Sequence, residues 1–299
     1  MMHFLDAFSS YLLLEKGLSK ASIDAYINDV KKLFSFFDLQ NIKKPIAAIT
    51  LEDLQQLMAY LNDLGLTTSS QARIISGLKA YFEFLSIEDL VEDDPTQLLS
   101  APKLGKYLPS FLTHQEVEKI MAQIDHSKPE GIRNRAMIET LYACGLRVSE
   151  LVNLRMSYMY LDAQYIRVIG KGNKERIIPI GETAIKHIRF YISNRNQMSN
   201  IKKEAEDICF LNRRGNKLSR NMVFMIIKDL VRQTDIQKNV SPHTFRHTFA
   251  THLIEGGANL RVVQDLLGHK SIITTEIYTH LDMGYLRETI QMFHPRFKK

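Results

Sequence analysis

The segment 241–246 places a histidine and an arginine where they could bind a phosphate group. Ser241-Pro242 is a helix-start signal, so His243 and Arg246, three residues apart, should share one helix face near the positively polarised N-terminal end. Such a face suits an anion, because a guanidinium offers paired N–H donors to phosphate oxygens. Taken alone, the two residues could equally be a capping histidine and a surface arginine.

Four further residues become informative only together. Arg147 follows an apolar segment that ends in glycine, and Lys171 lies between two glycines. His269 also follows a glycine, and Tyr278 lies nine residues beyond it. Each has a simpler interpretation by itself, as a solvated cation, a turn residue or an amphipathic core tyrosine. Four other histidines are expected to be helix-surface or packing residues: His247, His252, His280 and His294.

Considered together, the six residues resemble the tyrosine recombinase, or phage integrase, family. The likeness covers about 111–295, and the ending Phe293–Arg296 places it nearest the Xer recombinases of bacterial chromosome dimer resolution, on the XerD side. No catalytic position departs from the family pattern. The matching motifs are GLRVSEL, GKGNKER, SPHTFRHTFATHL, LLGH and TTEIYTHL.

The resemblance implies a site-specific recombinase that cuts and rejoins DNA through a 3′-phosphotyrosyl intermediate on Tyr278. By resemblance, Tyr278 displaces a 5′-hydroxyl and Lys171 protonates that leaving oxygen. His243 would be the general base, and His269 would hydrogen-bond the phosphate or the attacking oxygen. The expected role is resolution of chromosome dimers at a dif-like site for segregation at cell division.

Arg147 and Arg246 are expected to bind the non-bridging oxygens of the attacked phosphate. Attack concentrates negative charge on these oxygens, and arginine keeps its positive charge while matching them in fork geometry. The cations would take the place of a metal, and the sequence has no DxD or HExxH motif and no close His/Cys cluster. We therefore expect no cofactor and no metal.

Other function classes stay open at this point. They are an integrase or transposon-type recombinase, a type IB topoisomerase-like DNA-relaxing enzyme, a non-catalytic DNA-binding module, and a metal-dependent nuclease or transposase. The pair His243 and His269, with the Xer-like ending, favours recombination over relaxation. Candidates at all six positions count against a silent module, and no acidic triad supports the nuclease.

The resemblance also implies partners. It predicts double-stranded DNA with two half-sites and a tetramer on that DNA, whose other subunits are identical or a paralogous XerC-like recombinase. An FtsK-like DNA translocase is a further expected partner. In the family, the segment equivalent to 282–292 docks on a neighbouring subunit, although its amphipathic pattern requires only some apolar surface.

The expected fold is mainly α, with an N-terminal helical bundle over 1–104 that the resemblance makes a SAM-like core-binding domain. Ser19 and Thr50 are predicted helix N-caps, for helices over 19–37 and 51–64, and a third helix follows Thr67. Arg73 and Lys79 in that third helix lie off the apolar stripe, free for phosphate contact. The segment 101–112, with two prolines and a glycine, is the predicted linker.

Residues 105–299 are predicted to form an α-rich catalytic domain with a small antiparallel β-sheet. Thr113 and Glu116 form a capping-box pattern that opens it, and strands over 165–169 and 176–180 flank a Gly-Lys-Gly-Asn turn. Helices are predicted over 114–125, 130–144, 149–154, 182–197, 219–234, 243–255, 259–267, 271–277 and 282–292.

Composition sets the outer limits. The net charge is +6, but residues 1–104 hold 9 Lys and Arg against 14 Asp and Glu, and the remaining residues hold 30 against 19. The basic character, which suits a polyanionic partner, therefore belongs to the second part. Two cysteines indicate no disulfide framework, and without a signal-peptide pattern or a long apolar run we expect a cytoplasmic protein with no membrane insertion.

Overall fold

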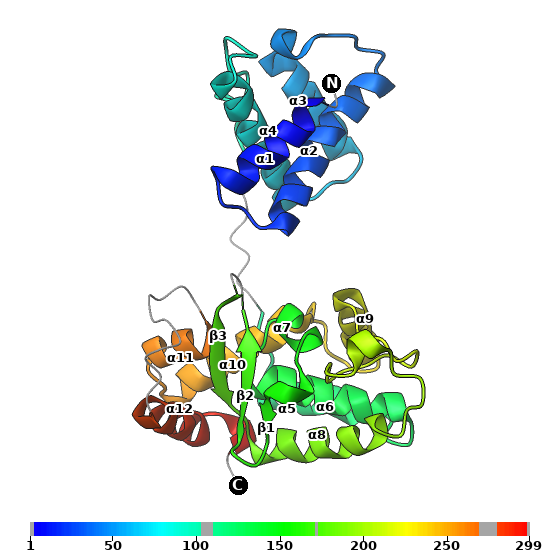
Figure 1. Cartoon of the computed structure of the whole chain (residues 1–299), viewed down its shortest axis with the longest axis vertical. Coiled ribbons are helices and arrows are strands. Elements are labelled where there is room, and N and C mark those ends of the chain that lie inside the picture. Colours follow the sequence, from blue (N-terminus) through cyan, green and yellow to red (C-terminus); the bar gives the residue numbers. More distant parts are fainter. Residues whose placement is uncertain (1–2, 103–109, 171–172, 269–279, 298–299) are drawn as a thin grey trace. The chain divides into compact units, whose positions relative to one another are not determined.

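The computed structural model describes residues 3–102, 110–170, 173–268 and 280–297. The chain divides into two compact units, Met1–Tyr107 and Leu108–Lys299 (Figure 1). The division falls inside the segment 101–112. No helix in the described residues combines the length and the apolar character needed to cross a bilayer.

The first unit is a bundle of four α-helices. Ser19 and Thr67 cap two of them by accepting the backbone N–H groups of Ser22 and Ser70, and Thr50 forms a capping box with Asp53. These local signals place the three predicted helices where they are observed. A helix before them was not predicted. The helices are α1 His3–Leu14, α2 Lys20–Leu39, α3 Leu51–Asp63 and α4 Thr68–Ile87.

A buried carboxylate joins α2 to α4. Asp29 on α2 has no exposed surface and faces Gly77 of α4, where an added Cβ would lie 3.1 Å from the Asp29 Cβ. It forms ion pairs with Lys32 at 3.0 Å and with Arg73. Arg73, predicted to be free for phosphate contact, therefore has a protein partner 44 residues away in sequence, although 45% of its side chain is exposed.

The second unit combines helices with a three-stranded antiparallel sheet in the order β1-β2-β3. Val168 pairs with Arg176 in the β2–β3 register, and Gly170 N–H donates to Lys174 O at 2.7 Å at the base of the predicted turn. The strands are β1 Met159–Tyr160, β2 Tyr165–Ile169 and β3 Glu175–Pro179. The helices are α5 His114–Ala122, α6 Pro129–Ala143, α7 Val148–Val152, α8 Glu182–Arg195, α9 Arg220–Arg232, α10 Pro242–Gly256, α11 Leu260–Leu267 and α12 His280–Phe293.

The core of this unit is built around α6, which packs against α8 and α10. Residues on every side of α6 are buried, from Gly131 to Ala143. The predicted helices and strands of this unit are confirmed where the structure describes them, and the largest difference is at α5, predicted to end at 125 and ending at Ala122. The predicted helix 271–277 lies outside the described residues.

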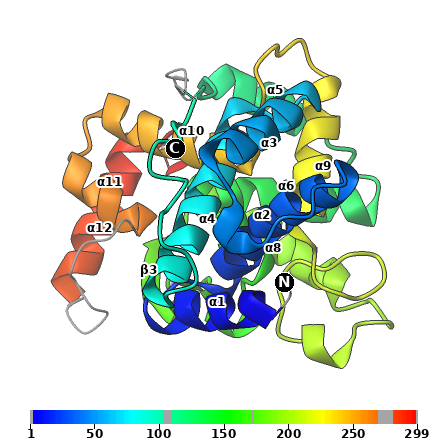
Figure 2. The same ribbon diagram turned by 90° about the horizontal axis from the view of Figure 1, so that it is seen from above.

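The C-terminal segment packs on its own domain. Leu286 and Ile290 are buried, and α12 contacts α10, α11 and β3, with α11 and α12 side by side in both views (Figure 1, Figure 2). Beyond α12, His294 is buried against the rings of Tyr142 and Phe249, with centroids 4.8 and 5.2 Å away. The amphipathic pattern of 282–292 thus finds its apolar surface within the same chain.

Candidate active site

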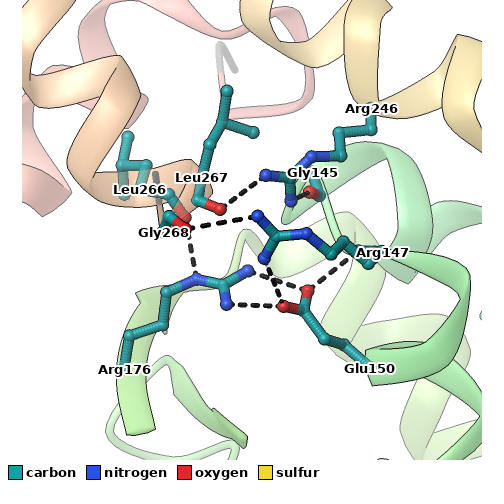
Figure 3. Close-up of polar contacts among 8 residues, drawn as sticks. All are labelled: Gly145, Arg147, Glu150, Arg176, Arg246, Leu266, Leu267 and Gly268. Carbon is teal, nitrogen blue, oxygen red and sulfur yellow. Dashed lines mark hydrogen bonds and ion pairs between the residues drawn. The ribbon is translucent and has the colours of Figure 1, made fainter. Parts of the chain in front are cut away.

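A glycine brings the two predicted phosphate-binding arginines to one place (Figure 3). Gly145 follows α6 with φ +56°, and a Cβ there would lie 2.4 Å from the Phe249 ring on α10. Only glycine at this position lets the chain that follows α6 pass so close to α10. Arg147 caps α7 two residues later, and Arg246 extends from α10.

Arg147 is held from one side and remains accessible from another. Its Nη1 donates to Glu150 Oε1 at 2.9 Å, and its backbone N–H donates to Glu150 Oε2 at 2.8 Å. Its Nη2 donates to the backbone carbonyl of Gly268 at 3.2 Å. The side chain is 31% exposed, so part of the guanidinium can still meet a ligand.

Arg246 lies deeper in the same site. Its two terminal nitrogens donate to the carbonyls of Gly145 at 2.7 Å and Leu267 at 2.5 Å. Burial lowers the pKa of Arg246 to about 9; repulsion from Arg147 and Arg176 acts in the same direction, and Glu150 partly offsets it. A bound anion would relieve this accumulation of buried positive charge.

Glu150 and a third arginine, Arg176, complete the arrangement, and neither was predicted. Arg176 on β3 donates to both carboxylate oxygens of Glu150, at 2.7 and 2.8 Å. Burial raises the pKa of Glu150, but the hydrogen bonds and charge of Arg176, with the hydrogen bonds of Arg147, hold that pKa below its ordinary value overall. The sequence did contain a signal for each residue. Glu150 lies three residues after Arg147, and Arg176 occupies an inward-facing position of a strand.

The end of α11 lies among the three guanidinium groups. Arg176 Nε donates to Leu266 O at 3.0 Å, while Arg246 and Arg147 bind the next two carbonyls, of Leu267 and Gly268. A helix C-terminus carries partial negative charge on unpaired carbonyls, which favours cations there. Each of three consecutive carbonyls thus has its own arginine, immediately before His269 in sequence.

His243 is exposed on the first turn of α10, one turn before Arg246. The helix start predicted at this point is confirmed, with Pro242 in the first turn and the backbone N–H of Ser241 donating to Thr244 Oγ1 at 3.0 Å. The imidazole of His243 is therefore in contact with solvent, whereas the guanidinium of Arg246 is buried.

The other three predicted residues, Lys171, His269 and Tyr278, lie outside the described residues. Two cavities of ≈ 410 and ≈ 430 Å³ are lined by residues remote from this cluster, including Arg133 and Arg195 in the first and Arg189 in the second. Neither cavity is therefore part of the arginine cluster.

Comparison with known families matches two segments of the chain. A model described as the phage integrase family matches residues 110–284, and one described as the phage integrase N-terminal SAM-like domain matches residues 5–89. The first segment contains every residue of the arginine cluster and all six predicted catalytic positions. The second covers the helical bundle.

Curated relatives match nearly the whole chain. A protein named tyrosine recombinase XerD from Staphylococcus saprophyticus is 41% identical over 293 residues, covering 98% of each chain. Proteins of the same name from Listeria innocua and Chlorobaculum tepidum are each 40% identical, covering 99% and 98% of this chain and 100% and 96% of their own.

Solved structures share the fold. XerA recombinase is 29% identical with a TM-score of 0.50 over 98% of this chain and 99% of its own. XerH recombinase bound to a palindromic difH substrate is 22% identical with a TM-score of 0.69 over 90% and 79%. With a family model over more than half of its length and relatives near 40% identical from end to end, the chain belongs to the phage integrase family and is a site-specific tyrosine recombinase that cuts and rejoins DNA.

Proposed function

We propose that this recombinase acts at a dif-like site and resolves chromosome dimers before cell division. The observation that carries the catalytic part is the convergence of Arg147 and Arg246 on the C-terminal end of α11, where Arg147 is also held by the Glu150 carboxylate. The biological part is supported by the full-length relatives named XerD and by the solved XerH complexes with difH DNA.

In the proposed reaction, the phenolic oxygen of Tyr278 attacks the scissile phosphorus and the bond from phosphorus to the 5′-oxygen breaks. His243 accepts the phenolic proton, Lys171 donates a proton to the departing 5′-oxygen, and His269 hydrogen-bonds the phosphate or the attacking oxygen. The 3′-phosphotyrosyl bond conserves the energy of the broken bond. A 5′-hydroxyl of a second strand then reverses the step and releases Tyr278, without ATP.

The proposed task of the arginine pair is to bind the non-bridging oxygens as their charge grows. Arg147 has the accessible guanidinium, and Arg246 sits in a drier place where electrostatic interactions are stronger. A pKa near 9 still leaves Arg246 charged at neutral pH. The phosphodiester would contribute one negative charge to a cluster of three guanidiniums and one carboxylate.

The proposed assembly is a tetramer on double-stranded DNA with two half-sites, with identical subunits or a paralogous XerC-like partner and an FtsK-like translocase as regulator. Residues 1–104 would grip DNA as the core-binding domain, and 105–299 would carry the chemistry, in the cytoplasm. The SAM-like match over 5–89 and the length shared with the XerD relatives support this division.

The test uses a nicked duplex of about 30 bp that carries a dif-like site, beside a scrambled duplex of the same length. The purified chain should form a covalent protein–DNA complex on the dif-like duplex only, equally in magnesium and in excess EDTA, and should join a 5′-hydroxyl strand from a second duplex. No covalent complex, or a strict divalent requirement for cleavage, would overturn the proposal. Relaxation of plasmid without strand transfer would point to a topoisomerase.

A further inference from the structure

Every guanidinium nitrogen of Arg176 has a protein partner among the described residues. Its terminal nitrogens bind both oxygens of Glu150, and its Nε binds Leu266 O. Its side chain is 7% exposed, against 31% for Arg147. A DNA phosphate has no open path to such a group, so any contribution of Arg176 to the reaction must act through its neighbours.

Two glycines enclose the Arg176 guanidinium. A Cβ on Gly170 would lie 3.6 Å from Arg176 Nη1 and from Glu150 Oε1, and a Cβ on Gly268 would lie 3.1 Å from Arg176 Nη1. The hairpin and the α11 end therefore approach the same planar group through bare backbone. In sequence, Gly170 directly precedes Lys171, and Gly268 directly precedes His269.

We propose that Arg176 is a positioning residue of the recombination reaction. By binding Glu150 on both oxygens it fixes the carboxylate that orients Arg147, and by binding Leu266 O beside two glycine backbones it fixes where the segments carrying Lys171 and His269 begin. This inference rests on the proposed roles of Arg147, Lys171 and His269. The roles proposed for those three residues can hold even where the positioning role of Arg176 fails.

Arg176 positions Arg147 through the charge of Glu150 as well as through geometry. Glu150 is buried and faces Arg147 from α7, Arg176 from β3 and, at longer range, Arg246 from α10. Burial raises the pKa of Glu150, and without Arg176 the hydrogen bonds of Arg147 are what remains to oppose that rise. Arg147 would then be held by a carboxylate that is itself loosely held, and that becomes neutral as the pH falls.

The test compares four variants of the full chain on the nicked dif-like duplex. They are Arg176→Gln, Arg176→Lys, the double variant Glu150→Gln with Arg176→Gln, and Arg167→Gln. Arg167 is the matched control, because it lies on the same hairpin and pairs with a carboxylate, Glu175, at 3.3 Å, while its contacts among the described residues are with Glu175 and the Tyr158 ring rather than with Glu150 or α11. Thermal melting, half-site binding and the single-turnover rate of covalent complex formation are measured for each.

Arg176→Gln should bind the half-site within about threefold of wild type and cleave about 100-fold more slowly, the scale expected when a reacting group is misplaced by about 1 Å. Arg176→Lys keeps the charge but cannot bind both oxygens of Glu150, so its cleavage should also slow, by about tenfold or more. Arg167→Gln should bind and cleave like wild type.

The pH profile separates positioning through Glu150 from a merely structural role. The rate of Arg176→Gln divided by that of wild type should fall further as the pH is lowered from 8 to 5, because loss of Arg176 removes the main cause that lowers the pKa of Glu150, so that Glu150 protonates more readily and releases Arg147. The double variant has no carboxylate at 150, so its ratio should not change with pH. A structural role would instead lower the Arg176→Gln rate by one factor at every pH.

Two results overturn the inference. One is wild-type cleavage in Arg176→Gln or Arg176→Lys, and the other is a ratio for Arg176→Gln that is flat with pH. If Arg176→Gln melts below the assay temperature, Arg176→Lys decides alone through its binding and cleavage rates. A wild-type chain that forms no covalent complex contradicts the proposed function instead, whereas wild-type cleavage with unaffected Arg176 variants contradicts only the positioning role.

Discussion

At the residue scale, one buried carboxylate organises three arginines. Glu150 accepts hydrogen bonds from Arg147 and Arg176, and Arg246 lies close enough for its pKa to respond to all three charges. Buried charges of one sign are tolerated only with partners, and the partners here include three carbonyls of α11. The cluster therefore holds an excess of positive charge in a preorganised form, as the binding of a transient anion requires.

This arrangement predicts that lysine cannot replace either of the two arginines proposed to bind the phosphate. Arg147→Lys and Arg246→Lys should each fold but lose covalent complex formation by about 10²–10³-fold, because an ammonium cannot hold Glu150 or Gly145 and two phosphate oxygens together. Arg189→Lys is the control, since Arg189 is an exposed residue paired with Asp162. Near-normal cleavage by either site variant would mean that the pair does not bind the reacting phosphate.

The sequence predicted some of these residues and missed others for a physical reason. Arg147 and Arg246 lie within motifs that resemble a known family, so their types and neighbours were enough. Arg176 was missed because its partners are 26 and 90 residues away, and only the fold brings them to it. The ion pair of Arg73 was missed for the same reason, because the helix pattern cannot show the buried Asp29 opposite it.

At the element scale, the site depends on where helices end. The chain leaves α6 through Gly145, Arg147 is the N-cap of α7, and Gly268 is the C-cap of α11 with φ +64°. Helix ends carry unpaired N–H and carbonyl groups, and here the carbonyls are bound by arginines from other elements. The ends of α6, α7 and α11 thus meet at the cluster, where Arg246 from α10 and Arg176 from β3 reach them.

Gly145 is the element position most sensitive to substitution. Gly145→Ala should lower the melting temperature and slow cleavage, because alanine at φ +56° costs at least about 1 kcal/mol and its Cβ would overlap the Phe249 ring. Gly284→Ala is the matched control: it lies within α12 with no atom near its added Cβ, so it should melt at or above the wild-type temperature. Equal stability of Gly145→Ala and wild type would contradict the packing described at this turn.

Helix starts were predicted well where a capping residue marked them, and less well where only the spacing of apolar residues indicated a helix. The N-cap at Thr50, the capping box at Thr113 and the helix start at Ser241 are observed as predicted. The first helix was missed although Leu5, Phe8 and Leu12 follow helical spacing and are buried. Periodicity alone, without a preceding cap, gave no start point for it.

At the scale of the whole molecule, the two units differ in net charge. The acidic excess of residues 1–104 includes Asp29 and Asp53, which are buried in ion pairs with Lys32, Arg73 and Lys44 and so are not part of an exposed acidic surface. The second unit carries both the basic excess and the arginine cluster. Family membership, which no single element reveals, connects the two units to one reaction on DNA.

The most direct test of the central claim is to identify the residue that becomes bonded to DNA. The covalent complex from the nicked dif-like duplex is digested with nuclease and protease, and the nucleotide-bearing peptide is sequenced by mass spectrometry. The phosphate should be on Tyr278, and Tyr278→Phe should bind DNA but give no complex, while Tyr285→Phe, which changes an exposed tyrosine of α12, should give the wild-type amount. A phosphotyrosyl bond at any other residue, or a complex that persists in Tyr278→Phe, would contradict it.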